Sequence, residues 1–208
     1  MPGPLSRAAT ARARAHTSRS DRAERPDRAT RTTAPRPGAQ HVPPGPDPAA
    51  FRTAMGSFPT GVTLLTTGRG ASTAVITLNS LTAVSLDPVL LLVSVKSDGR
   101  MLPQVHANGG FAVNVLTAEQ DSWATHFSRP DRSSGLAAVE RLGAATGAGG
   151  QTVVPSAAVR IECALHAAHP AGDHTLLIGR VTALSCEPAP EPSAPLVFHR
   201  GRYARLAP

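Results

Sequence analysis

The side chains that could do chemistry by themselves are few, and their spacing does not suit it. Cys163, His166 and His169 form the densest group of possible metal ligands. Their stretch alternates apolar and polar residues, which predicts a strand, so Cys163 and His166 would point to opposite faces and could not share an ion. We therefore predict no metal site and interpret Cys163 and Cys186 as small, reduced core residues.

The motifs of nucleotide and ester chemistry are also missing. Residues 68–73 (GRGAST) match a dinucleotide fingerprint only in part, because the third glycine is absent. The segment also lies between two predicted strands, whereas a Rossmann site needs a helix directly after the strand. No Walker loop, no G-x-S-x-G elbow and no evident carboxylate pair occurs. Any chemistry would therefore have to come from a bound cofactor.

The composition separates an N-terminal extension from a domain. Residues 1–50 hold 9 of the 21 basic residues and 9 of the 20 prolines, but none of the aromatic residues. Such a segment buries too little apolar surface to offset its ordering entropy. We therefore predict a disordered, basic, Pro- and Arg-rich extension over residues 1–47 and one folded domain over residues 48–208.

The same arithmetic limits the partners and the location of the protein. Asp21, Glu24 and Asp27 interrupt the basic run, and the extension has no aromatic side chains for stacking on bases, so we predict no nucleic-acid partner. No run approaches the ~18 apolar residues of a membrane span. A signal peptide is excluded by the lack of an apolar stretch near the N-terminus. These patterns favour a cytoplasmic protein with no membrane partner.

The folded part is typical of a mainly β protein. Asp47 and Pro48 are a helix-start signal, and residues 159–166 show clean period-2 alternation, with Glu162 on the exposed face. Within the next expected strand, residues 174–184, Gly179 predicts a bulge. We expect strands at 62–67, 73–79, 89–95, 111–116, 159–166, 174–184 and 196–198, short helices at 48–55, 99–107 and 118–127, and a long loop at 128–152. This pattern favours a closed or nearly closed antiparallel barrel.

Five blocks of this sequence resemble one family, in the family's own order. They are residues 51–63 (FRTAMGSFPTGVT), 77–88 (TLNSLTAVSLDP), 111–116 (FAVNVL) with Gln120 and Phe127, 172–179 (GDHTLLIG) and 195–203 (PLVFHRGRY). Together they are similar to the flavin reductase-like split-barrel family, the reductase partners of two-component flavin monooxygenases. The resemblance implies a mainly β, FMN-binding split barrel of Greek-key type with a few short helices.

The resemblance also implies an activity and partners. It predicts a homodimer that binds FMN or FAD, takes hydride from NADH or NADPH and supplies reduced flavin to a partner monooxygenase. Hydride would pass from nicotinamide C4 to flavin N5, a step that needs no acid or base from the protein. A non-catalytic flavin- or haem-binding barrel, acting as a carrier or sensor, remains the alternative.

Site residues follow from the same resemblance, position by position. The predicted flavin contacts are Thr77, Leu78, Asn79, Ser80, Ala83, Ser97, Asp98, Gly99 and Arg100. The predicted nicotinamide contacts are His174, which is also the catalytic candidate, Phe198 and Tyr203. Taken by themselves, Arg100 reads as an exposed helix-start arginine, His174 as a strand-end histidine held by Asp173, and the two aromatic residues as a plug for a barrel end.

Overall fold

The computed structural model describes residues 45–186 and 193–206. The chain divides into two units, of which the second begins at Gly45. The predicted disordered extension falls almost wholly outside the described residues, and its character stays a prediction.

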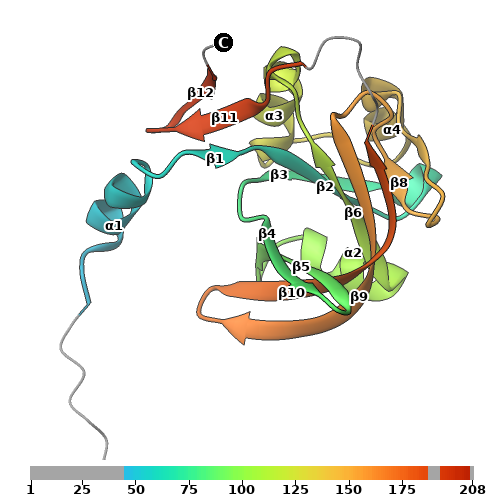
Figure 1. Ribbon diagram of the computed structural model, residues 1–208, viewed down its shortest axis with the longest axis horizontal. Coiled ribbons are helices and arrows are strands. Elements are labelled where there is room, and N and C mark those ends of the chain that lie inside the picture. Colours follow the sequence, from blue (N-terminus) through green and yellow to red (C-terminus); the bar gives the residue numbers. More distant parts are fainter. Residues whose placement is uncertain (1–44, 187–192, 207–208) are drawn as a thin grey trace, which may run out of the picture. The chain divides into compact units, whose positions relative to one another are not determined.

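The main element is a seven-stranded antiparallel sheet in the order β3-β2-β6-β9-β10-β5-β4 (Figure 1). Its strands are β2 (Thr63–Thr67), β3 (Ala74–Leu78), β4 (Thr82–Leu86), β5 (Val89–Lys96), β6 (Gly110–Val115), β9 (Val159–Ala171) and β10 (His174–Cys186). A smaller sheet joins β1 (Thr60–Gly61), β11 (Leu196–His199) and β12 (Arg202–Arg205), and a short pair joins β7 (Ala145–Thr146) and β8 (Thr152–Val153).

Four α-helices lie outside these sheets: α1 (Pro48–Met55), α2 (Met101–Asn108), α3 (Asp121–Ser128) and α4 (Gly135–Leu142). Two single-turn 3₁₀ helices, η1 (Gly70–Ser72) and η2 (Ala118–Gln120), complete the set for the described residues. The Asp47 side chain accepts a hydrogen bond from the Ala50 N–H, and Pro48 opens α1, as the sequence predicts. The expected mainly β class with a few short helices is therefore confirmed.

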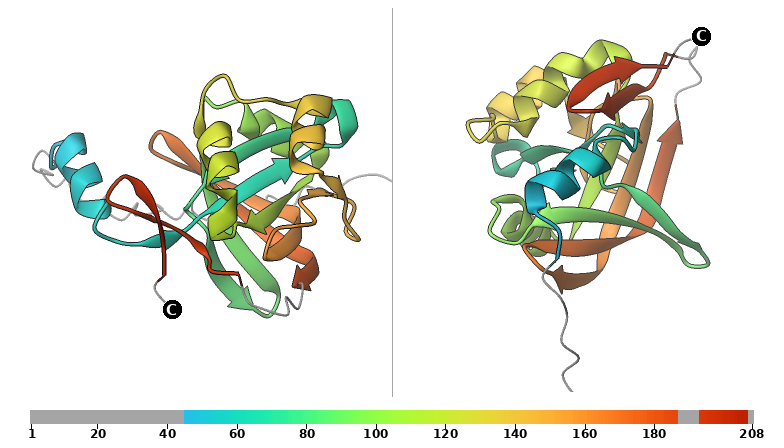
Figure 2. Two further views of the ribbon diagram at one scale, coloured as in Figure 1. Left: turned by 90° about the horizontal axis from the view of Figure 1, so that it is seen from above. Right: turned by 90° about the vertical axis from the view of Figure 1, so that its left-hand side faces the viewer.

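The sheet curls strongly because of how its two edges are connected. β3 and β4 stand at opposite ends of the strand order, yet only residues 79–81 separate them in the chain. So short a connection forces the two edges toward each other, and the views of Figures 1 and 2 show the sheet wrapped round on itself. The edges do not pair, however, so the sheet is not a closed barrel. The gap between them positions the candidate site.

A β-bulge lies opposite Gly179, where the sequence predicts one within β10. The pairing of β10 with β9 shifts register between Ile178 and Gly179. A Cβ at Gly179 would lie 2.7 Å from Cζ of Phe111 and 2.8 Å from Cβ of Cys163. The extra residue of the bulge is His166 on β9, because Ile178 pairs with Ala167 and Gly179 with Leu165, so glycine at 179 serves the close approach of β10 to the packed interior.

Two apolar clusters hold the sheet and helices together. One packs α3 and α4 on β2 and β3 through buried side chains that include Leu64, Phe127 and Leu142. The other fills the inside of the curl, where Met101 and Val105 of α2 meet Phe111. The helix α2 therefore packs inside the curled sheet, and its first turn lies beside the gap between β3 and β4.

Several elements in the C-terminal half differ from the expectation: α4, β7 and the start of β8 lie in the expected loop, and β12 was not expected. Residues 128–152, expected as a loop, contain α4, which buries Ala138 and Leu142 and ends at Gly143 with a left-handed φ of 55°. The Ser134 start, the i, i+4 apolar pair and the terminal glycine are helix signals hidden by the surrounding Gly and Ser. The strand β12 was also missed; it pairs with β11 as a hairpin.

The predicted burial of two residues, Glu162 and Cys186, was wrong. Glu162 was expected on an exposed face, but it is only 4% exposed because residues 147–151 fold over it. Its carboxylate accepts hydrogen bonds from the backbone N–H groups of Gly149 (2.9 Å) and Gln151 (2.8 Å). Cys186 was expected in the core, but it is exposed at the end of β10. Cys163 is buried, as predicted.

The two thiols should differ sharply in reactivity. Burial, with a further contribution from Glu162, raises the pKa of Cys163 to about 12, so almost no thiolate forms at neutral pH. We expect Ellman's reagent at pH 8 to modify one thiol per folded chain, Cys186, and two in urea. A Cys186→Ser chain should show no fast thiol. Two fast thiols in the folded protein would contradict the buried placement of Cys163.

Candidate functional site

A cleft of about 550 Å³ lies at the gap in the curled sheet. Its walls come from the end of β3 and the following turn, the end of β5, the start of α2, the segment after α3 and the start of β10. The lining residues are Ile76, Thr77, Leu78, Asn79, Ser80, Ser94, Val95, Lys96, Asp98, Gly99, Arg100, Met101, Ser128, Pro130, Arg132 and His174. This volume is in the range of small-molecule and cofactor sites.

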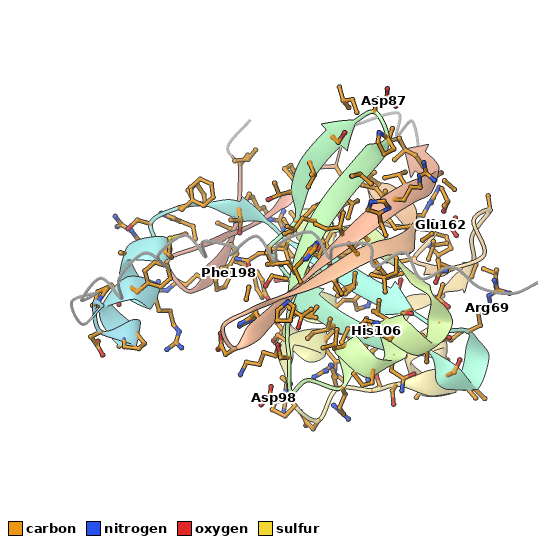
Figure 3. All side chains as sticks on the ribbon, turned by 90° about the horizontal axis from the view of Figure 1, so that it is seen from below. Arg69, Asp87, Asp98, His106, Glu162 and Phe198 are labelled. Atoms are coloured by element: carbon orange, nitrogen blue, oxygen red, sulfur yellow. The ribbon has the colours of Figure 1, made fainter. Side chains whose placement is uncertain are left out.

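Most of the site residues expected from the sequence come together in this cleft. Thr77, Leu78, Asn79, Ser80, Asp98, Gly99, Arg100 and His174 all line it. The other four do not. Ala83 is exposed on β4, where it pairs with Leu91, and the hydroxyl of Ser97 lies 2.9 Å from that of Thr175. Phe198 and Tyr203 lie on the β11–β12 hairpin. Asp98, which lines the cleft, and Phe198, which does not, are both labelled in Figure 3.

The polar side chains of the β3–β4 turn have partners within the protein. The Thr77 hydroxyl donates to the Ala124 carbonyl (2.7 Å), and the Ser80 hydroxyl donates to the Ser94 carbonyl (3.1 Å) and accepts from the Ser94 N–H (2.9 Å). The Asn79 amide donates to the hydroxyl of Thr60 (3.0 Å). These side chains therefore fix the turn, and a ligand would meet their remaining lone pairs and the backbone.

Backbone groups of β3 face the cleft because β3 is an edge strand. The carbonyls of Thr73 and Val75 point away from β2, since they accept from Gly135 N–H (2.7 Å) and from Nε of Arg132 (2.9 Å). Backbone groups alternate in direction along a strand. The N–H and carbonyl of Thr77, two residues after Val75, therefore also point away from β2. The edge thus offers a peptide group to a ring with donor and acceptor atoms.

The rim of the cleft is cationic. Lys96, Arg100, Arg132 and His174 line it, and Asp98 is the single acidic residue among the described lining residues. One Nη of Arg100 donates to the Pro130 carbonyl at 2.6 Å, which holds the arginine against the segment after α3. Burial, and secondarily the charge of Arg100, lower the pKa of the Arg132 guanidinium. Among the described residues neither of these two arginines forms an ion pair with a carboxylate, an arrangement that favours an anion.

His174 is held in the cleft by its neighbour in the chain. Nδ1 of His174 lies 2.8 Å from Oδ1 of Asp173, and this hydrogen bond, followed by the charge of His174, lowers the pKa of Asp173. Register places His174 opposite Lys96 on β5. With Nδ1 donating to the carboxylate, Nε2 is the nitrogen left for a ligand.

Sequence reasoning missed Arg132, Ser128 and Pro130. Ser128 ends α3, and Pro130 and Arg132 lie in the turn after it, which we compared with the family pattern but from which we named no site residue. Arg132 also donates to the Arg129 carbonyl (3.0 Å), so this turn is anchored at both ends. An arginine within a short Arg-Pro-Asp-Arg turn was the available signal, but only tertiary structure shows which arginine faces the cleft.

The same turn depends on a neutral histidine. Nε2 of His126 accepts the Ser133 N–H at 3.1 Å, which requires an unprotonated Nε2. Burial, and next the charge of Arg141, lower the pKa of His126 below 6.5. The ring of His126 also packs edge-on against Phe127, at 4.8 Å between centroids.

We therefore expect His126 to make the protein less stable in mild acid. Because the unfolded chain takes up the proton more readily, this contribution is complete above pH 6.5 and falls as the pH drops from 6.5 through the lowered native pKa. The loss cannot exceed about 1.4 kcal/mol per pH unit for one proton. Urea unfolding between pH 7.5 and 5.5 should show a smaller pH dependence for His126→Gln; an unchanged dependence would contradict this role.

A second, larger groove lies on the other side of the β3–β4 turn. It has a volume of about 1300 Å³ and is lined by residues that include Asn79, Ser80, Phe58 and Phe198. Tyr203 packs against Phe198 at 5.6 Å between ring centroids, and burial raises the pKa of its phenol. Phe198 therefore shares this groove with Asn79 and Ser80 of the turn, and the contact of Phe198 and Tyr203 with nicotinamide stays a prediction.

Neither a metal centre nor a membrane span emerges from the described residues. No group of three or more His, Cys, Asp or Glu side chains is placed to hold an ion in residues 45–186 and 193–206. Within the same ranges, no helix has both the length and the apolar character needed to cross a bilayer.

Comparison with known proteins agrees with this geometry. Residues 55–207 match the flavin reductase like domain. An NADH-dependent FMN reductase of Streptomyces nodosus subsp. asukaensis is 45% identical over 161 residues, which cover 77% of this chain and 86% of the relative. The reductase subunit HsaB of a flavin-dependent monooxygenase from Rhodococcus jostii is 34% identical over 164 residues, 78% of this chain and 80% of that one.

A solved structure supports the same assignment. The NADH:FAD oxidoreductase SgcE6 of Streptomyces globisporus, in complex with NAD and FAD fragments, superposes with a TM-score of 0.69 at 35% identity. The match covers 78% of this chain and 94% of that one. The sequence, the curled sheet and the cleft lead to one conclusion: the chain belongs to the flavin reductase-like domain family.

Proposed function

We propose that the protein is an NADH-dependent flavin reductase that supplies reduced FMN or FAD to a partner monooxygenase. The observation that carries this is the cleft, in which apolar side chains and a free strand edge stand beside a cationic rim. A flavin nucleotide needs both parts, since its ring is flat and largely apolar and its phosphate is anionic. Relatives named as NADH-dependent FMN and FAD reductases support the activity over a carrier or sensor role.

We also propose a fold type and a domain boundary for the protein. The unpaired edges β3 and β4 make the curled sheet a split barrel of the FMN-binding, Greek-key type, and residues 48–208 form the reductase domain. The split supports this assignment because it gives a ligand access to backbone groups that a closed barrel would have paired.

The residues of the cleft would hold the flavin in two ways. Ile76, Leu78 and Val95 offer apolar contact to the ring, while the Thr77 peptide faces its edge. Arg100 and the first turn of α2 attract the phosphate, because the N–H groups and the dipole of a helix start favour an anion. When bound, the flavin supplies the chemistry, accepting hydride from reduced nicotinamide.

The protein's own contribution is therefore positioning. Holding two reactants in a productive orientation, away from water, can account for a large part of a rate enhancement. His174, fixed by Asp173 beside Lys96, would orient the nicotinamide nucleotide at the mouth of the cleft. No general acid or base is assigned.

We also propose that the protein is a homodimer. The helix α1 buries none of its residues in its own chain, and Phe51, Met55 and Phe58 remain about half exposed or more. Leu86, at the end of β4, is 88% exposed. Apolar surface of this kind is typical of an interface, and a second copy would cover it. Sedimentation equilibrium should give twice the chain mass of 21.4 kDa.

One experiment tests the main proposal. The purified protein, loaded with FMN or FAD under anaerobic conditions, should lose the visible flavin absorbance on addition of NADH, and it should regain this absorbance on admission of air. A carrier or sensor would bind flavin without bleaching. If neither flavin binds, or NADH is not consumed, the proposed function is wrong.

The role of His174 gives a separate expectation. His174→Ala should raise the KM for NADH about tenfold, the equivalent of roughly 1.4 kcal/mol, while the Kd for flavin changes little. Steady-state kinetics and a flavin fluorescence titration measure the two quantities. His166→Ala, an exposed position on β9 outside the cleft, is the matched control. An unchanged KM for NADH would remove His174 from the site.

A further inference from the structure

A second, smaller cleft continues the flavin cleft along β3. Its volume is about 280 Å³, and it shares Arg100, Met101 and Arg132 with the larger cleft. The larger cleft follows residues 76–80 and the smaller one residues 71–75, so the two form consecutive stretches of one groove beside the same edge strand. The two arginines stand where the stretches meet.

This second cleft is suited to an anion with a polar extension. Arg100 and Arg132 supply positive charge, and no carboxylate is among its described lining residues. Asp131, the nearest acid in the chain, is engaged with Arg129 at 3.1 Å. Apart from the apolar Val75 and Met101, the remaining lining is small or polar and includes Gln104, Ser133 and Ser134.

Two helix starts reinforce the charge of this cleft. The first turn of α2 lines it through Met101 and Gln104, and Ser134, which precedes α4, lines it without capping that helix. The hydroxyl of Thr73, in the same wall, is enclosed by the protein and does not face the cleft, so it adds nothing to ligand binding. The two arginines, supported by the adjoining helix starts, thus favour a phosphate-bearing ligand beyond the first phosphate site.

We propose that this second cleft holds the adenylate half of FAD, with Arg132 at the second phosphate, so that the protein prefers FAD to FMN. This inference rests on the proposed flavin site. FMN would fill only the larger stretch of the groove and leave the smaller stretch to water. NADH carries the same adenosine diphosphate group, but His174, its proposed contact, lies in the larger stretch and not in this one.

Calorimetric titration of the full-length protein with FMN and with FAD tests the proposal. The wild-type Kd for FAD should be about tenfold or more below that for FMN, as one additional charged contact would give. Gln104→Trp, which fills the second cleft from an exposed position on α2, should raise the Kd for FAD about tenfold and that for FMN less than twofold. Ala107→Trp, exposed on the same helix outside the cleft, should change neither.

The other outcomes separate the inference from the function on which it rests. AMP should compete with FAD but not with FMN. If FMN binds and NADH reduces it, but FAD binds no more tightly, the adenylate site is wrong and the reductase stands. If Gln104→Trp raises the Kd for NADH and not that for FAD, the cleft serves the pyridine nucleotide and the proposal falls. If neither flavin binds, the proposed function itself fails.

Discussion

Replacing Glu162 by alanine is expected to destabilise the protein by about 3 kcal/mol, because a buried carboxylate that accepts hydrogen bonds is removed. Its two oxygens are the partners of the backbone N–H groups of Gly149 and Gln151. Water cannot easily replace them, since Glu162 is nearly fully buried beneath the turn. The turn packs tightly against this carboxylate, since a Cβ on Gly147 would lie 2.2 Å from Oε1 of Glu162.

Urea unfolding of variants separates this effect from a general loss of charge. Glu162→Gln keeps the shape and one acceptor but turns an N–H group toward a backbone donor, so it should lose less than the alanine variant, roughly 1 to 2 kcal/mol. Glu140→Ala, exposed on α4, should cost less than about 0.5 kcal/mol. A Glu162→Ala protein as stable as the Glu140→Ala control would show that the turn does not depend on the carboxylate.

The wrong prediction that Glu162 is exposed shows what a sequence pattern does not determine. Period-2 alternation along 159–166 correctly predicts a strand and correctly buries Cys163, because alternation determines which residues share a face. It does not say what covers the other face. That depends on the turn at 147–151, whose glycines carry no periodic signal and whose fold becomes visible only when its N–H groups meet Glu162.

The same division applies to the candidate site. Thr77, Arg100 and His174 were expected from the family resemblance, position by position, and they line one cleft because the short β3–β4 connection curls the sheet. Arg132 was not expected from it, and its place follows from a contact across 57 positions with the carbonyl of Val75. The resemblance therefore predicted the residues near strand ends, whereas long-range contacts determined how the cleft is completed.

The anchoring role of Arg100 has a selective consequence that binding can measure. Arg100→Ala should weaken FMN binding by about tenfold to a hundredfold, the range that loss of a charge-assisted hydrogen bond gives. Riboflavin, which has the same ring without the phosphate, should bind the variant and the wild type alike. The ratio of the two Kd values thus isolates the phosphate contact from any change in the shape of the cleft.

Two further variants make this test specific to the position. Arg100→Lys should recover part of the FMN affinity, because the charge returns but the planar fork that reaches both a phosphate and the Pro130 carbonyl does not. Arg205→Ala, exposed on β12 outside the cleft, should leave both Kd values unchanged. If Arg100→Ala weakens riboflavin as much as FMN, the arginine acts by holding the Pro130 segment in place, and the phosphate must be bound by Arg132 or Lys96.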